Sequence, residues 1–180
     1  MDTKLDPKTL NLVLPYGNAR IFHTPISSDV FEMNYRIISA TKAAIFARGF
    51  GYAADAGPRI ATLRLKDEGR RDAKDLGEEG DGGAQALLSE IKRLTMILKP
   101  GPDGWDTVPV SQGLDAEEWK EVEAILVFFT CFYWMAPLRQ RRSIADGAAS
   151  GLGGEITSHS LSEWIASYPP STQDEASPTT

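Results

Sequence analysis

The feature that most constrains this sequence is an apolar run near residue 130. From Ile125 to Met135 the chain reads ILVFFTCFYWM. A glutamate-rich stretch precedes the run, and Asp115 is placed to cap a helix that we expect over residues 116–136. A helix that is apolar on every side must be surrounded by other elements or by a partner. The rest of the chain therefore has to cover this helix, and any face left uncovered favours self-association or the binding of a client protein.

Further helices are expected on both sides of this run. Apolar residues at three- to four-residue spacing predict helices over 29–48 and 84–98, and weaker patterns predict helices over 138–150 and 159–167. The apolar stripe of the first helix consists of Val30, Met33, Ile37, Ile38, Ala44 and Ile45, and that of the second consists of Leu87, Leu88, Ile91, Leu94 and Leu98.

Strand signals are confined to shorter segments. Residues 10–26 read LNLVLPYGNARIFHTPI, in which a Pro-Tyr-Gly-Asn turn separates two apolar stretches, and this pattern predicts a β-hairpin. Residues 58–76 fit either a helix or an extended segment. Trp105 to Val110 fits a short strand, and Pro109 favours an edge position.

Two segments contain too little apolar surface to offset the entropy of ordering them. These are the acidic, glycine-rich loop 74–83, which we expect to be flexible, and the polar tail 169–180, which we expect to be disordered. The expected fold is mainly α. It is a single helical domain over 1–168 with a small N-terminal β-hairpin at 10–26 and a disordered C-terminal tail.

Composition excludes several classes of function. The chain carries 25 acidic and 19 basic residues, for a net charge of -6, which argues against nucleic-acid binding and against an electrostatic membrane anchor. The longest apolar stretch, 124–138, is shorter than the roughly 20 residues that cross a bilayer. A single cysteine and the lack of a secretory leader fit a reducing cytoplasm.

No catalytic or metal-binding pattern is present. His23 and His159 are far apart in the sequence, and zinc sites require three or four clustered ligands. Cys131 lies between phenylalanines, in apolar surroundings that raise a thiol pKa. The glycine-rich segments match neither phosphate-binding nor dinucleotide-binding motifs. We therefore expect a non-enzymatic protein without a cofactor or a metal.

The aromatic run is the best candidate for a protein-binding surface. Most of it is expected in the core, with Phe129 as the clearest core residue, because Phe129 lies four residues after Ile125 on one helix face. Tyr133 and Trp134 are expected at an exposed rim, since each has a polar atom that tolerates water. The candidate protein-binding residues are Phe132, Tyr133, Trp134, Arg139 and Arg142.

The order of these features resembles the tail assembly chaperones of long-tailed bacteriophages, small proteins encoded just ahead of the tape-measure protein. The resemblance extends over most of the chain and contains no catalytic signature. The segments that carry it are LPYGNARIFHTPIS (14–27), FEMNYRIISATKAAIF (31–46), ALLSEIKRLTMILKPGPDGWDTVPV (86–110), EVEAILVFFTCFYWM (121–135) and SHSLSEWIASYPPST (158–172).

This resemblance implies a role in the cytoplasm of a bacterial host. The chain would bind the tape-measure protein, keep it soluble and help to recruit tail tube subunits, and would be absent from the finished virion. The alternative is a structural phage tail or head–tail connector protein that is retained in the virion.

Overall fold

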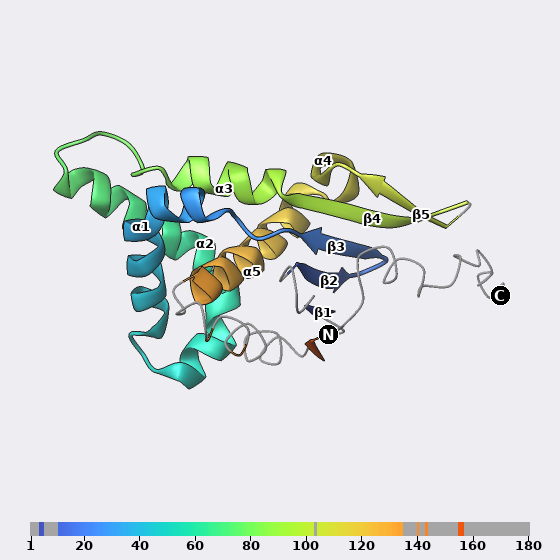
Figure 1. Cartoon of the computed structure of the whole chain (residues 1–180), viewed down its shortest axis with the longest axis horizontal. Helices are drawn as coiled ribbons and strands as arrows, with labels where there is room; N and C mark the ends of the chain where they lie inside the picture. The colour runs from blue at the N-terminus through green and yellow to red at the C-terminus, as the bar shows by residue number, and fades with distance from the viewer. Residues whose placement is uncertain are drawn as a thin grey trace, which may run out of the picture.

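In the computed structural model of this chain, the described residues are 4–5, 11–102, 104–134, 140, 143 and 155–156. Strands gather at one end of the described structure, and most of the helices lie toward the other end (Figure 1). The strands are β1 (Lys4–Leu5), β2 (Leu12–Tyr16), β3 (Ala19–His23), β4 (Thr95–Gly101), β5 (Gly104–Val108) and β6 (Glu155–Ile156). The helices are α1 (Ser28–Phe46), α2 (Phe50–Asp75), α3 (Ala84–Arg93), α4 (Val110–Gly113) and α5 (Ala116–Trp134).

The N-terminal hairpin is confirmed. Strands β2 and β3 pair antiparallel, with Tyr16 opposite Ala19, and the turn between them contains Gly17 at a φ of 53°. Glycine adopts this left-handed conformation without steric cost, which accounts for the tight turn. Immediately after β3, Ser27 caps α1 by accepting a hydrogen bond from the backbone N–H of Val30 at 3.3 Å.

The expected fold is confirmed in part: helices make up most of the described structure, but the strands extend well beyond the N-terminal hairpin and the short strand expected from Trp105. The hairpin is part of a six-stranded sheet with the order β5-β4-β3-β2-β1-β6, in which only β1 and β6 pair in parallel. Strand β5 lies at the edge of the sheet and overlaps the predicted segment Trp105 to Val110. The described fold therefore combines a group of helices with a mainly antiparallel sheet.

The largest single error concerns residues 84–98, which were expected to form one helix. Helix α3 ends at Arg93, and β4 begins at Thr95 and pairs along β3. Without β4, the backbone of β3 would present an unpaired edge. Leu98 extends the helical spacing of the stripe, but the alternation of buried Ile97 with exposed Met96 is that of a strand.

Helix α2 settles the ambiguous segment 58–76, which is helical through Asp75. It packs against both α1 and α5. On α1 the core face consists of Ile37, Ile38, Thr41 and Ile45. Met33 was expected on that face and is instead 76% exposed, although it lies one turn before buried Ile37.

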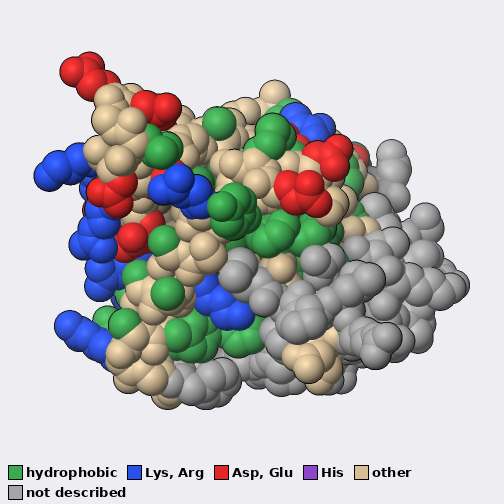
Figure 2. Space-filling view, turned by 60° about the vertical axis from the view of Figure 1, so that its left-hand side comes forward, with side chains coloured by type: hydrophobic (Ala, Val, Ile, Leu, Met, Phe, Trp, Pro, Cys, Tyr) green, Lys and Arg blue, Asp and Glu red, His purple; other side chains and the backbone are tan. Residues whose placement is uncertain are grey.

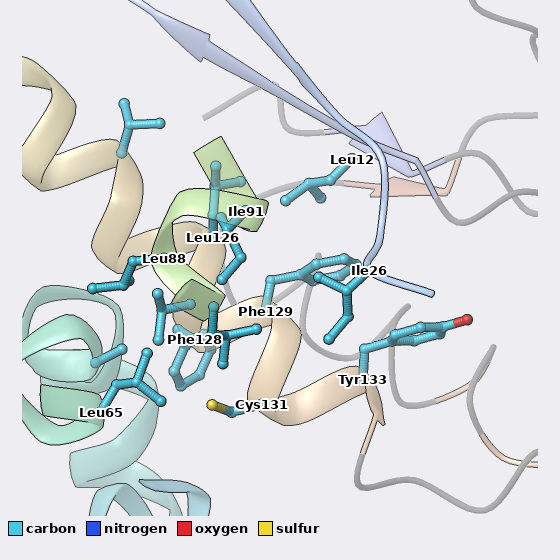
Figure 3. Packing of buried hydrophobic residues seen from close by; sticks show 14 of the residues in the cluster. Leu12, Ile26, Leu65, Leu88, Ile91, Leu126, Phe128, Phe129, Cys131 and Tyr133 are labelled. Atoms are coloured by element: carbon cyan, nitrogen blue, oxygen red, sulfur yellow. The ribbon is translucent and has the colours of Figure 1, made fainter. Parts of the chain in front are cut away.

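Helix α5 is the centre of the core, as the apolar run predicts. Asp115 caps it, since one carboxylate oxygen accepts from the N–H groups of Glu117 and Glu118 at 2.8 and 2.9 Å. Phe129 is fully buried beside Leu12 and Ile26, and Phe128 points toward the helix side of the core (Figure 3). The helix is covered on several faces because the sheet, α2 and α3 all pack around it.

A glycine sets the spacing between α2 and α5. A Cβ atom at Gly57 would lie 2.6 Å from Cε2 of Phe128 and 3.0 Å from Cγ2 of Ile45. These distances are too short for non-bonded carbon atoms. Gly57 therefore allows the backbone of α2 to approach the ring of Phe128 closely.

The opposite face of the sheet carries a second, smaller apolar cluster. Val13, Phe22 and Leu98 are buried there, and Trp105 packs against them. The predicted helices 138–150 and 159–167 and the predicted tail 169–180 lie outside the described residues, apart from the single residues 140 and 143.

Candidate protein-binding surface

The aromatic side chains at the end of α5 pack against α1. Trp134 stacks on Phe31 with ring centroids 5.2 Å apart, and Phe132 meets Phe46 at the same distance. Tyr133 stacks on Phe129 at 6.0 Å. The first two contacts join residues that are roughly 85 to 105 positions apart in the sequence, whereas the third lies within α5.

The expected exposure of Tyr133 and Trp134 is wrong. They are only 8% and 7% exposed, because Phe31 covers the face of Trp134 and Phe129 covers that of Tyr133. Phe129 is in the core as expected, and Phe132 is only partly buried. Of the three aromatic candidates, Phe132 is therefore the one that reaches the surface.

Phe132 belongs to a surface that sequence reasoning did not find. Phe31, Tyr35, Lys42 and Phe46 follow one another on α1 at intervals of four, seven and four residues, which places them on one helix face. With Phe132 they form what we call the aromatic edge. Tyr35 is 56% exposed, and the other four side chains are partly buried.

The lysine of this edge contacts an aromatic ring, and a buried thiol lies next to that ring in the sequence. The ammonium of Lys42 lies 5.5 Å from the ring centroid of Phe132, in a cation–π contact. Burial lowers the pKa of Lys42. Burial also raises the pKa of Cys131 to about 12, so that the thiol is inert at neutral pH, as the apolar surroundings predict.

The remaining candidates, Arg139 and Arg142, lie outside the described residues. One signal could have revealed the aromatic edge. Phe31, Tyr35 and Phe46 share a helix face that lies beside the apolar stripe of α1, and exposed aromatic residues at such positions are typical of interfaces.

His23 has a structural role in the core. The Thr95 hydroxyl donates to the carbonyl of Ile91 at 2.7 Å, so its oxygen accepts from Nδ1 of His23 at 3.0 Å. Nε2 then carries no proton, and it has no hydrogen-bond partner within the described part of the chain. Burial lowers the pKa of His23 to about 3, which keeps the ring neutral.

A surface hollow of about 450 Å³ lies at the end of α3 and is lined by Ser89, Lys92, Arg93 and Val110, among others. Its cations are already engaged. Arg93 donates two hydrogen bonds to Glu90 at 2.7 Å, and the Lys92 ammonium lies 5.3 Å from the ring centroid of Trp119. The hollow therefore offers little free positive charge to an anionic ligand.

Among residues 11–102 and 104–134, no three His, Cys, Asp or Glu side chains are grouped to hold a metal ion. Over the same residues, no helix combines the length and the apolar character needed to cross a membrane. Comparisons of the chain with protein-family models, with curated proteins and with solved structures find no match. Among the described residues, the aromatic edge is therefore the best candidate for a protein-binding surface.

Proposed function

We propose that this protein is a tail assembly chaperone of a long-tailed bacteriophage, acting in the host cytoplasm. It binds the tape-measure protein and helps to recruit tail tube subunits. The proposal rests on the resemblance of segment order and size, and the aromatic edge supplies a physical means of binding such a client.

The structural observation that supports the proposal is the exposure of Tyr35 within a row of aromatic residues. A tape-measure protein is long and helical, and an apolar stripe on such a helix needs an apolar surface to cover it before assembly. Tyr35 and Phe132 offer that surface, and aromatic residues are frequent hot spots in interfaces. Lys42 adds one positive charge next to the aromatic rings.

The test is co-expression with the client that the proposal implies, a tape-measure protein of the same phage, followed by co-purification. The wild-type chain should keep the client soluble, and the double variant Tyr35→Ala/Phe132→Ala should retain less than about a tenth of the bound client, since a hot-spot pair contributes 2 kcal/mol or more. Met96→Ala is the matched control, because Met96 is an exposed apolar residue on β4, outside the aromatic edge.

Two results would contradict the proposal. The first is equal recovery of the client with the double variant and with Met96→Ala. The second is a stoichiometric amount of this chain in purified virions by mass spectrometry, which would instead support a structural tail or head–tail connector protein.

A further inference from the structure

The exposed face of α2 carries a row of cations around one exposed leucine. The residues are Arg59, Leu63, Lys66, Arg70 and Lys74, and we call them the basic stripe. Their spacings of four, three, four and four residues keep them on one side of the helix. At 1.5 Å per residue, the stripe extends over about 22 Å, or four turns.

The opposite side of α2 fixes the direction in which the basic stripe points. Ala53, Ala61, Leu65 and Ala73 are buried, and through this side α2 packs against α1 and α5. Leu63 is 64% exposed. Figure 2 turns the α1–α2 end toward the viewer and shows Lys and Arg side chains gathered along the left-hand edge, with hydrophobic side chains nearby.

Most of these cations are uncompensated. Arg70 pairs with Asp67, but Arg59, Lys66 and Lys74 make no ion pair within the described part of the chain. Four cations outside the stripe are paired, with Arg36 to Asp72, Arg71 to Glu68, Arg93 to Glu90 and Lys120 to Glu117. Other described cations, such as Arg48 and Lys99, also make no ion pair, but the stripe places three unpaired cations on one helix face beside an exposed leucine.

We propose that the basic stripe is a docking surface for an acidic amphipathic helix of a partner protein. An apolar side chain of that helix covers Leu63, and carboxylates spaced along its flanks pair with Arg59, Lys66 and Lys74. The four-turn length of the stripe is enough for a second helix to lie along this part of α2. This partner contacts a different surface from the aromatic edge, so the inference does not depend on the proposed function.

Nucleic acid fits the stripe less well. A phosphate backbone would satisfy the cations, but it would leave Leu63 uncovered, and the net charge of -6 repels a long polyanion.

The probe is a synthetic 18-residue helical peptide with leucines along one stripe and glutamates on both flanks. Its control is a peptide of the same composition, scrambled so that leucines and glutamates share no face. By fluorescence anisotropy with the full chain, the amphipathic peptide should bind at least about tenfold more tightly than the scrambled one. Binding should weaken as salt rises from about 50 to about 300 mM, because exposed ion pairs are screened.

Two triple variants separate docking from general charge effects. Arg59→Gln/Lys66→Gln/Lys74→Gln should weaken binding about tenfold or more, since each exposed pair contributes up to about fivefold. The matched control is Lys92→Gln/Arg93→Gln/Lys120→Gln, which also removes three positive charges but from other surfaces. It should change the affinity for the amphipathic peptide less than about twofold. Leu63→Gln should weaken the binding of the amphipathic peptide and leave the binding of the scrambled peptide unchanged.

Any of three results would overturn the inference. These are equal affinity for the two peptides, equal losses in the two triple variants, or tighter binding of a 20-nucleotide single-stranded DNA than of the amphipathic peptide. Glutamine is a good helix former and all the substituted cations are at least partly exposed, so circular dichroism should confirm that each variant remains folded.

Discussion

The indole ring of Trp134 stacks on the phenyl ring of Phe31, with centroids 5.2 Å apart and ring planes 13° from parallel. The contact joins the end of α5 to the first turn of α1. Because Trp134 is only 7% exposed, removing its ring leaves a cavity between these helices.

Trp134→Ala should therefore lower the free energy of unfolding by about 3–5 kcal/mol. Chemical denaturation measures the loss directly. Phe132→Ala is the comparison, and it should cost less than half as much, because Phe132 is only partly buried. If Trp134→Ala unfolds at the same denaturant concentration as the wild type, the stacking contact does not stabilise the fold.

Acid should destabilise the protein through His23. Its pKa is about 3 in the folded state and about 6.5 in the unfolded state, so between these values the unfolded chain binds a proton that the folded chain excludes. Stability is complete above pH 6.5 and falls as pH drops, by about 1.4 kcal/mol per unit, or roughly 2 kcal/mol at pH 5. Urea titrations at pH 7 and pH 5 measure this difference.

The control for the pH effect is His23→Gln. This variant lacks the titrating ring, and its stability should change between pH 7 and pH 5 by about 2 kcal/mol less than that of the wild type. An equal pH dependence in both proteins would mean that His23 is not the responsible group.

The thiol of Cys131 should resist alkylation in the folded protein. A pKa of about 12 leaves almost no thiolate at pH 8, and burial blocks the reagent. Labelling with iodoacetamide, followed by mass spectrometry, should show modification only in denaturant. Rapid labelling of the native chain would indicate that the end of α5 opens readily.

The cap of α5 can be tested at a surface position. Asp115→Ala removes two hydrogen bonds to the N–H groups of Glu117 and Glu118 and should cost about 1 kcal/mol. Asp115→Ser should retain most of that stability, since serine is also a good N-cap. Equal losses in the two variants, measured by thermal or chemical unfolding, would show that the cap hydrogen bonds contribute little.

Local chemistry was the part of this fold that could be predicted from the sequence. The turn at Gly17, the cap at Asp115 and the core position of Phe129 all depend on residues within a few positions of one another. Strand β4 could not be predicted in this way, because its stabilisation comes from pairing with β3, about 75 residues earlier.

The exposure of the candidate binding residues Tyr133 and Trp134 was predicted wrongly for a similar reason. The polar atoms of Tyr133 and Trp134 suggested an exposed rim, but the partner that buries Trp134 is Phe31, more than 100 positions away. Tyr35, in contrast, lies beside the apolar stripe of α1 and is 56% exposed. The spacing of apolar residues in one sequence does not show which distant side chains come into contact, so it cannot predict which aromatic residues are buried.

The close approach of Gly57 to Phe128 has an evolutionary consequence. Because a methyl group at position 57 would collide with the ring of Phe128, the two positions share one fixed volume and should vary together among proteins with this fold. The order of substitution also matters. Phe128→Leu first creates room that Gly57→Ala can then occupy, whereas Gly57→Ala alone passes through an overpacked intermediate. The accessible mutational path between two stable variants therefore begins on α5 and ends on α2.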